Sequence, residues 1–366
     1  MPNHAITIGG RVVGAGHPPL VIAELSGNHN GSLDRALELV QRAAACGAGA
    51  LKLQTYTAGT LTINSRRPEF FIDSPGSPWH GRRLWELYEE AHTPWEWHEP
   101  LFDASRRAGM LCISTAFDES SLELLLRLGA DAIKIASFEL VHLPLIDAVA
   151  RSGKPVILST GMGTREEIGD AVQTLRESTS DFILLKCTSA YPAIEAEANL
   201  RTMVDLRDRY QCEVGLSDHT LRPHLAFGAV ALGAVVIEKH FTLSRADGGV
   251  DSEFSIEPHE LTELVDGVGL VWQGLGEVRY GVQEREKASL AERPSIYVVA
   301  PVAKGETLTA RNVRVIRPGN GLAPKHLPAI LGCSARHDIE SGTPMSWALI
   351  DDASIAPADA GIRENR

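Results

Sequence analysis

The feature that most constrains the fold is a series of short apolar runs separated by amphipathic segments. Eight runs rich in Val, Ile, Leu and Ala occupy residues 20–25, 50–56, 111–116, 132–137, 156–160, 182–188, 212–218 and 235–241. Most of the connecting segments repeat apolar residues every three or four positions, as on one face of a helix. Eight strand-then-helix units predict a parallel (β/α)₈ TIM barrel, whose functional groups gather at the carboxyl ends of the strands. An open doubly wound sheet is the alternative, but no Gly-x-Gly-x-x-Gly follows the first run.

Two stretches depart from this repeat. Residues 57–109 are too long for one crossover and are rich in aromatic residues and Pro, so we expect an inserted loop and two helices over the barrel mouth. After residue 294 the pattern changes to short β-like runs such as SIYVVAPV, NVRVIRP and PMSWALI, divided by turn signals. The sequence predicts a barrel domain at 1–275, a linker at 276–294, a small β-rich domain at 295–351 and a flexible tail at 352–366.

Composition excludes several classes of partner. The net charge of −12 argues against nucleic acid and anionic membranes, so an anionic substrate requires a local basic pocket. The chain has no uninterrupted apolar stretch approaching about 18 residues and no basic leader before an apolar core. Its five cysteines lack Cys-x-x-Cys spacing. These features predict a cytoplasmic protein without a membrane span.

The strand ends are strongly polar, although a buried parallel strand normally is not. His219 and His240 follow neighbouring strands and could together hold a divalent metal with open positions. The alternative is that each is a lone, hydrogen-bonded histidine. Side chains alternate along a strand, so Glu238 and His240 face one side.

Lysines and hydroxyls at the other strand ends indicate a site for a small phosphorylated or carboxylated anion. The residues concerned are Lys52, Lys134, Ser137, Ser159 and Ser217. Solvated strand ends are the simpler alternative, and a Schiff-base lysine is a competing role for either Lys.

Two predicted loops could have either a structural or a ligand-binding role. SGNHNG at 26–31 suits a tight helix entry with Ser32 as N-cap, and contact with a ligand is equally open. RPGNGLAPK at 317–325 presents Arg317 on a rigid loop that could reach an anionic or hydroxylated substrate, or could be a surface turn.

Long ordered motifs resemble the sialic acid synthase family, and in particular its pseudaminic acid synthase branch. They include VIAELSGNHNGSLDRALELV, LKLQTYT, LYEEAHTPWEWHEPLF, IKIASFE, LSTGM, LLKCTSAYPA, VGLSDHT, VIEKHFTLSRADGGVDSEFSIEP and RPGNGLAPK, and together they span residues 20–350. The resemblance implies a TIM barrel followed by an antifreeze-like (SAF) domain. It also implies condensation of phosphoenolpyruvate with an amino-sugar aldehyde, with release of phosphate. The implied cofactor is a divalent metal, Mn²⁺ first and Mg²⁺ or Co²⁺ as alternatives.

The resemblance assigns roles to individual residues. It implies that Glu24 is the general acid/base and that His219 and His240 ligate the metal. It places the lysines and serines named above on phosphoenolpyruvate. Sugar contacts fall to Gln54, Ser189, Tyr191, Glu238, Asp251 and Arg317. In this family the small domain caps the partner's barrel, which implies a domain-swapped homodimer.

Two positions depart from the usual family pattern. Ser189 stands where sialic acid members usually have Asn, which disfavours N-acetylneuraminate as product and suits the pseudaminate branch. STAFD at 114–118 stands where related sequences often read Ser-Thr-Pro-Phe-Asp. N-acetylneuraminate or legionaminate synthase, a Schiff-base aldolase and a non-catalytic sugar-binding protein remain the alternative functions.

Overall fold

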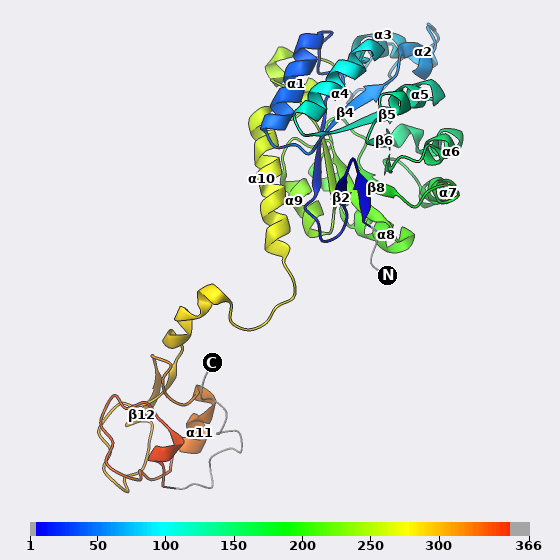
Figure 1. Cartoon of the computed structure of the whole chain (residues 1–366). Coiled ribbons are helices and arrows are strands. Elements are labelled where there is room, and N and C mark those ends of the chain that lie inside the picture. Colours follow the sequence, from blue (N-terminus) through cyan, green and yellow to red (C-terminus); the bar gives the residue numbers. More distant parts are fainter. Residues whose placement is uncertain (1–4, 352–366) are drawn as a thin grey trace. The chain divides into compact units, whose positions relative to one another are not determined.

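A computed structural model describes residues 5–351, and the chain divides after Gly276 into two compact units (Figure 1). Each unit has its own apolar core. The strands of the described part are β1 (Ile6–Ile8), β2 (Arg11–Val13), β3 (Leu20–Glu24), β4 (Ala50–Thr55), β5 (Leu111–Ala116), β6 (Ala132–Ile135), β7 (Val156–Ser159), β8 (Phe182–Cys187), β9 (Glu213–Asp218), β10 (Val236–His240), β11 (Ser295–Val298) and β12 (Val313–Ile316). The helices are α1 (Leu33–Ala45), α2 (Ala58–Leu61), α3 (Leu84–Ala91), α4 (His98–Arg107), α5 (Glu119–Arg127), α6 (Leu143–Arg151), α7 (Arg165–Arg176), α8 (Arg201–Tyr210), α9 (His224–Ala231), α10 (Pro258–Leu275) and α11 (Leu327–Ile330).

Strands β3 to β10 form a closed parallel barrel, so the predicted fold is confirmed. Neighbours follow chain order around the barrel, and β10 closes it by pairing with β3. Each of the eight predicted apolar runs is one of these strands, within two residues at either end. Helices surround the barrel (Figure 1). Their apolar faces pack on the outward-facing strand residues.

Local capping fixes where several helices begin. The Ser32 side chain accepts a hydrogen bond from the Arg35 amide at 3.3 Å, as predicted for an N-cap. Asp118 accepts one from the Ser121 amide at 2.9 Å at the start of α5. Because a cap satisfies an otherwise unpaired amide of the first turn, each helix begins at a defined distance from its strand.

An apolar plug closes the amino end of the barrel. Hairpin β1–β2 turns at Gly9 and Gly10, both at positive φ, and places Ile6, Ile8 and Val13 against residues that point into the barrel. A two-residue turn with positive φ at both positions is the type that matches strand twist, and Gly adopts it without strain. This end of the barrel interior is therefore apolar, and the polar strand ends lie at the other.

The insertion at 57–109 contains three helices. The expected pair over the mouth corresponds to α2 and α3, which pack against each other, while α4 packs against α1 on the outside of the barrel. The loop between α2 and α3 reaches the loops after β8 and β10, because Trp79 contacts the Tyr191 ring and donates to the Val250 carbonyl.

The C-terminal unit is built around an antiparallel pair, β11 and β12, extended by isolated bridges. Its core contains Ile296, Val298, Leu308 and Ile330. The expectation of a β-like run at PMSWALI is wrong in part, because Trp347–Leu349 forms a 3-10 turn between bridges at Pro344 and Ile350. The predicted linker contains two short 3-10 turns, Glu284–Glu286 and Ala288–Glu292. The tail predicted at 352–366 lies outside the described residues.

Across residues 5–351, every helix is too short or too polar to cross a membrane.

Candidate active site

Three charged side chains meet inside the barrel where β3, β4 and β10 end. Glu24 and Lys52 are register partners on neighbouring strands, and their side chains form a buried ion pair. The Lys52 ammonium also lies 3.6 Å from Glu238 Oε1. Ser217, the β9 partner of Glu238, donates to the same oxygen at 3.2 Å. Four strands therefore contribute to one buried polar cluster.

The two carboxyl groups of this cluster are shifted in opposite directions. Burial raises the pKa of Glu24, and the nearby Lys52 only partly offsets it. For Glu238, burial is outweighed by Lys52 and Lys134, which hold its pKa below the ordinary value. The pKa of Lys52 is raised because the two carboxylates outweigh its burial. Such a pair suits one carboxyl to carry a proton and the other to remain ionised.

A second ammonium lies on β6. Lys134 is buried, and its Nζ donates to Ser159 Oγ and to the Ile135 carbonyl, both at 2.7 Å. Burial lowers its pKa. Nearby, the Gly161 amide donates to Ser137 Oγ at 3.1 Å. A Cβ at Gly161 would collide with the hydroxyls of Ser137 and Ser189, so these groups line one small space that only glycine leaves open.

The two predicted metal-ligating histidines are neighbours. Their ring centroids lie 5.4 Å apart, and both side chains are buried. Nδ1 of His219 bonds to the Thr188 carbonyl at 2.9 Å, so in the neutral ring Nε2 is the acceptor. Nδ1 of His240 is buried without a hydrogen-bond partner among the described residues. Burial holds the pKa of His240 well below its ordinary value, so this ring is neutral, as a ligand must be.

These histidines fit a divalent cation. Hydrogen bonding of one ring nitrogen to a carbonyl orients the other toward a metal, and an unpartnered buried nitrogen is an available ligand. Within residues 5–351 no group of three or more His, Cys, Asp and Glu side chains could hold a metal. A cation at this pair would therefore take its remaining ligands from solvent or substrate, as in an open catalytic site.

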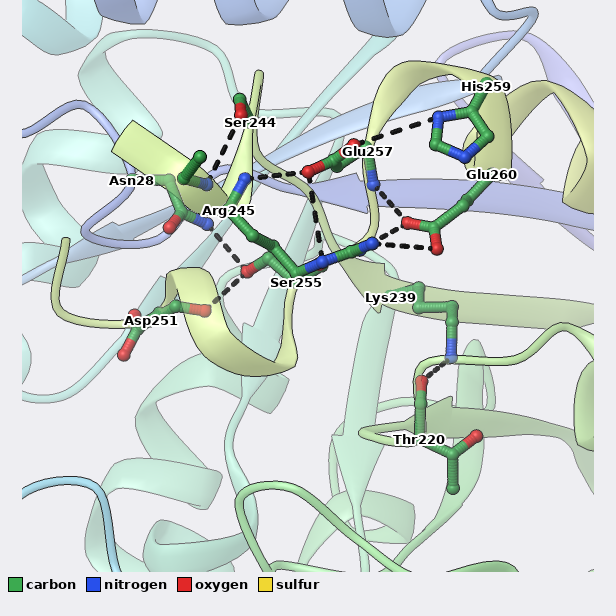
Figure 2. Close-up of polar contacts among 11 residues, drawn as sticks. Asn28, Thr220, Lys239, Ser244, Arg245, Asp251, Ser255, Glu257, His259 and Glu260 are labelled. Carbon is green, nitrogen blue, oxygen red and sulfur yellow. Dashed lines mark hydrogen bonds and ion pairs between the residues drawn. The ribbon is translucent and has the colours of Figure 1, made fainter. Parts of the chain in front are cut away.

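Lys239, between the two inward residues of β10, faces the other way. Its Nζ pairs with Asp218 Oδ2 at 2.8 Å and donates to the Thr220 carbonyl, a contact drawn in Figure 2. Because side chains alternate along a strand, Glu238 and His240 point into the barrel and Lys239 points outward. The Lys239–Asp218 pair joins the end of β9 to β10.

Asp251 is held by the SGNHNG loop. Its carboxylate accepts from Ser26 Oγ and, at 3.3 Å, from the Gly27 amide. Asn28 donates to Ser255 Oγ at 2.8 Å, and Ser255 donates to the Asp251 carbonyl at 2.6 Å (Figure 2). Burial raises the pKa of Asp251 to about 7. Asn28 thus ties two mouth loops together, which is a structural role for this motif.

The barrel brings most of the predicted site residues to one end of its interior, because they lie at strand ends or on the loops that follow. Gln54 is half-buried and faces the same side of β4 as Lys52. The Tyr191 ring packs against the His219 ring with 4.3 Å between centroids and a tilt of 40° between the ring planes. Arg317 belongs to the C-terminal unit, where its side chain is 72% exposed.

The structure adds three residues that sequence reasoning missed. Lys52 donates to Thr115 Oγ1 at 3.3 Å. Cys187 Sγ lies 4.0 Å from His219 Nδ1. The Oε2 atom of Glu139 is buried without a hydrogen-bond partner among the described residues, and burial raises the pKa of this carboxyl to about 7. Thr115 and Cys187 are polar residues at the inward-facing positions of apolar strands, and this pattern could have identified them. Glu139 lies in the turn after β6 and has no such pattern.

Comparison with known proteins finds relatives that match nearly the whole chain. Residues 39–280 match the NeuB family, and residues 293–351 match the SAF domain. The chain is 41% identical to a pseudaminic acid synthase of Campylobacter jejuni, over 88% of this chain and 94% of the relative. It is 35% identical to the N,N'-diacetyllegionaminic acid synthase of Legionella pneumophila, over 90% of this chain and 94% of the relative.

A solved structure shares the fold. The N-acetylneuraminic acid synthetase of Leptospira borgpetersenii, crystallised with citrate, superposes with a TM-score of 0.70 at 33% identity, over 79% of this chain and 95% of that protein. The chain therefore belongs to the NeuB family, the sialic acid synthase family that its motifs resemble, and it is an enzyme of that family.

Proposed function

We propose that this enzyme condenses phosphoenolpyruvate with 2,4-diacetamido-2,4,6-trideoxy-L-altrose and water, giving pseudaminic acid and phosphate. The observation that carries the proposal is that the barrel interior brings together the buried ammonium groups of Lys52 and Lys134, serine hydroxyls and a buried histidine pair. Buried charges are destabilising unless paired or ligand-bound, which favours a binding site for a strongly charged substrate. The identity to pseudaminic acid synthases supports this product.

The two lysines would neutralise phosphoenolpyruvate. Its phosphate and carboxylate require donors on more than one side, and Lys52 and Lys134 stand on β4 and β6, with β5 between them. Ser137 and Ser159 supply hydroxyl donors beside Lys134. Charge-assisted hydrogen bonds of this kind are the strong ones, and fixed donors stabilise charge that develops during reaction.

Glu24 would move the proton. The enol carbon attacks the sugar aldehyde, water adds to the resulting cation at C2, and the tetrahedral intermediate loses phosphate by C–O cleavage. Glu24 Oε1 has no hydrogen-bond partner among the described residues, whereas Oε2 pairs with Lys52. Its raised pKa brings it closer to neutral pH, where a general acid/base works best.

The histidine pair would hold a divalent metal, Mn²⁺ first. When bound, such a cation supplies Lewis-acid polarisation of the aldehyde oxygen. Around it Tyr191, Glu238 and Asp251 would contact the sugar. The two carboxyl groups are buried and Tyr191 is half-buried, which would limit the access of water.

We also propose that the C-terminal unit completes the site of a partner subunit in a domain-swapped homodimer. Arg317 stands exposed on a loop after β12, where its guanidinium lies 4.0 Å from the equally exposed Glu292 carboxylate. Such an exposed pair is weak, so a polar ligand could replace it. On the barrel unit, loops after β6, β7 and β8 expose Phe138, Val141, Met162 and Ile194, each more than half exposed. Apolar side chains grouped around a site opening are typical of a surface that another chain covers.

A phosphate-release assay across a sugar panel tests the function. The panel contains 2-acetamido hexoses and 2,4-diacetamido-6-deoxy hexoses, each with and without phosphoenolpyruvate, and Glu24→Gln as the inactive control. We expect the highest kcat/KM with the L-altro diacetamido sugar. A higher value with N-acetylmannosamine would assign the enzyme to neuraminate synthesis, and one with the legionaminate precursor to legionaminate synthesis.

Subunit mixing tests the dimer. Glu24→Gln and Arg317→Ala, each inactive alone, are combined under conditions that allow exchange. A shared site predicts recovery, since a mixed dimer holds one pocket with both wild-type residues. Absence of recovery, with exchange shown by tagged subunits, would mean that the small domain does not act in trans.

A Schiff-base aldolase is the second candidate, because burial lowers the pKa of Lys134 and an imine requires a neutral amine. Borohydride reduction with each substrate separates the two. A condensing synthase forms no trapped adduct, whereas an aldolase would be inactivated with a mass increase on Lys134.

A further inference from the structure

The inserted loop places a tryptophan beside the candidate site. Residues 71–83 fold back on themselves, with hydrogen bonds between Ile72 and both Gly81 and Arg82. Trp79 lies in this loop, and its indole N–H donates to the Val250 carbonyl at 2.8 Å. Because Val250 immediately precedes Asp251, the loop is attached to the segment that carries a predicted sugar contact.

Two aromatic rings pack against the histidine pair, and a third packs against these two. The ring centroids of Tyr191 and His219 lie 4.3 Å apart, and the Phe254 centroid lies 5.0 Å from those of Tyr191 and His240. Trp79 adds a further ring, 5.4 Å from Tyr191 and 5.8 Å from Phe254. These three residues, Trp79, Tyr191 and Phe254, form what we term the aromatic wall.

We propose that the aromatic wall receives the far end of the sugar and makes the enzyme select 6-deoxy substrates, with Trp79 as a specificity-determining residue. The inference rests on the proposed function. Carbon–carbon bond formation requires the aldehyde end of the sugar beside phosphoenolpyruvate, at the lysine cluster. The opposite end, C5 and C6, then points away from the lysines. Beyond the histidines, the half-buried rings of Trp79 and Tyr191, backed by the buried Phe254, offer it an apolar surface. A methyl at C6 fits this surface, whereas a hydroxyl would lose its hydration there.

The chain supplies a matched control. Trp95, in the same insertion, also donates its indole N–H to a backbone carbonyl, that of Tyr56 at 3.2 Å, and is likewise half-buried. Its ring makes no contact with the aromatic wall or the histidines among the described residues. Trp95→Ala therefore removes an equivalent tether without altering the wall.

The test compares kcat/KM for the 2,4-diacetamido-6-deoxy sugar and its 6-hydroxy counterpart in wild type, Trp79→Ala, Trp79→Phe and Trp95→Ala. An apolar pocket discriminates between such analogues by about 10- to 100-fold. We expect Trp79→Ala to reduce the wild-type ratio at least about fivefold, with KM for phosphoenolpyruvate unchanged. Trp79→Phe should keep most of the ratio, since it keeps a ring, and Trp95→Ala should keep all of it. Calorimetric titration of the reduced sugar, which lacks the aldehyde, should show the same ranking in affinity.

An equal loss of activity toward both sugars in Trp79→Ala would overturn the inference and make Trp79 a packing residue of the loop. A wild-type enzyme that does not condense the 6-deoxy sugar at all would instead refute the proposed function. The two failures are therefore distinguishable.

Discussion

Gly161 offers a sharp test of the anion site, because a single methyl group should block it. The Gly161 φ is not in the positive region, so alanine is acceptable to the backbone. Its Cβ, however, would lie 2.7 Å from Ser137 Oγ and closer still to Ser189 Oγ. Real Cβ atoms do not approach so closely, so in Gly161→Ala both hydroxyls must move.

The expected loss follows from the hydrogen bonds displaced. A hydrogen bond to a charged group contributes about 1.5–3 kcal/mol, and about 1.4 kcal/mol corresponds to a factor of ten. Displacing the Ser137 hydroxyl from the phosphate or carboxylate should lower kcat/KM for phosphoenolpyruvate about 10- to 100-fold. Ser189, which the family resemblance assigns to the sugar, must move as well, so KM for the sugar should also rise.

Gly169→Ala is the control. Gly169 lies inside α7, where an added Cβ meets only the Tyr210 hydroxyl at an ordinary 3.7 Å. Alanine is favoured over glycine in a helix interior, so this variant should keep full activity and gain up to about 1 kcal/mol of stability. Initial rates over a grid of both substrates, with melting curves for each variant, measure the effect. If Gly161→Ala folds normally and keeps wild-type kcat/KM for phosphoenolpyruvate, the space between Gly161 and Ser137 is not the anion site.

Three further predictions concern the proton, the metal and pH. Glu24→Gln keeps size but removes the basic carboxylate, so kcat should fall about 10²- to 10⁴-fold while calorimetry still detects phosphoenolpyruvate binding; an unchanged kcat would make Glu24 structural. Chelation should abolish turnover and Mn²⁺ should restore it, and His219→Ala should weaken Mn²⁺ binding measured by electron paramagnetic resonance; full activity after exhaustive chelation would refute the metal site. The pKa of Asp251 is raised from 3.8 to about 7, so its contribution to stability is complete below pH 3.8 and is lost as the pH rises through 7. Asp251→Asn should therefore show a smaller fall in Tm than wild type between about pH 5 and pH 7, and an equal fall would show that Asp251 does not titrate there.

Periodicity predicted the barrel because its signal is local. Each strand is buried on both faces and reads as an apolar run, and each helix repeats its apolar face every three or four residues. The closing hairpin β1–β2 was missed, although ITIGGRVV carries both alternation and a Gly-Gly turn. The prediction of a strand at PMSWALI was wrong in part because its apolar residues join the small core around a 3-10 turn. The spacing of apolar residues alone does not distinguish such a segment from a strand.

The site was predictable where strand register determines direction, and less so elsewhere. Glu24, Lys52 and Glu238 follow from the convergence of strand ends in a barrel. The part played by Trp79 could not be inferred, because it depends on how a long insertion folds back and which carbonyl its indole meets. The same holds for Glu139, whose burial arises from packing of the turn after β6 and not from any sequence pattern.

The arrangement of charges explains why the pKa values of the two buried carboxyl groups, Glu24 and Glu238, shift in opposite directions. Lys52 stands between Glu24 and Glu238, and it is the main favourable partner of the Glu24 carboxylate. An anionic substrate beside Lys52 competes for that ammonium and adds like charge near Glu24. Both effects favour the protonated carboxyl, and burial already acts in the same direction. Glu238 keeps its ionised form because Lys134 and Ser217 also stabilise it. If phosphoenolpyruvate binds as proposed, it would therefore raise the pKa of Glu24 further and favour the form in which a general acid is useful.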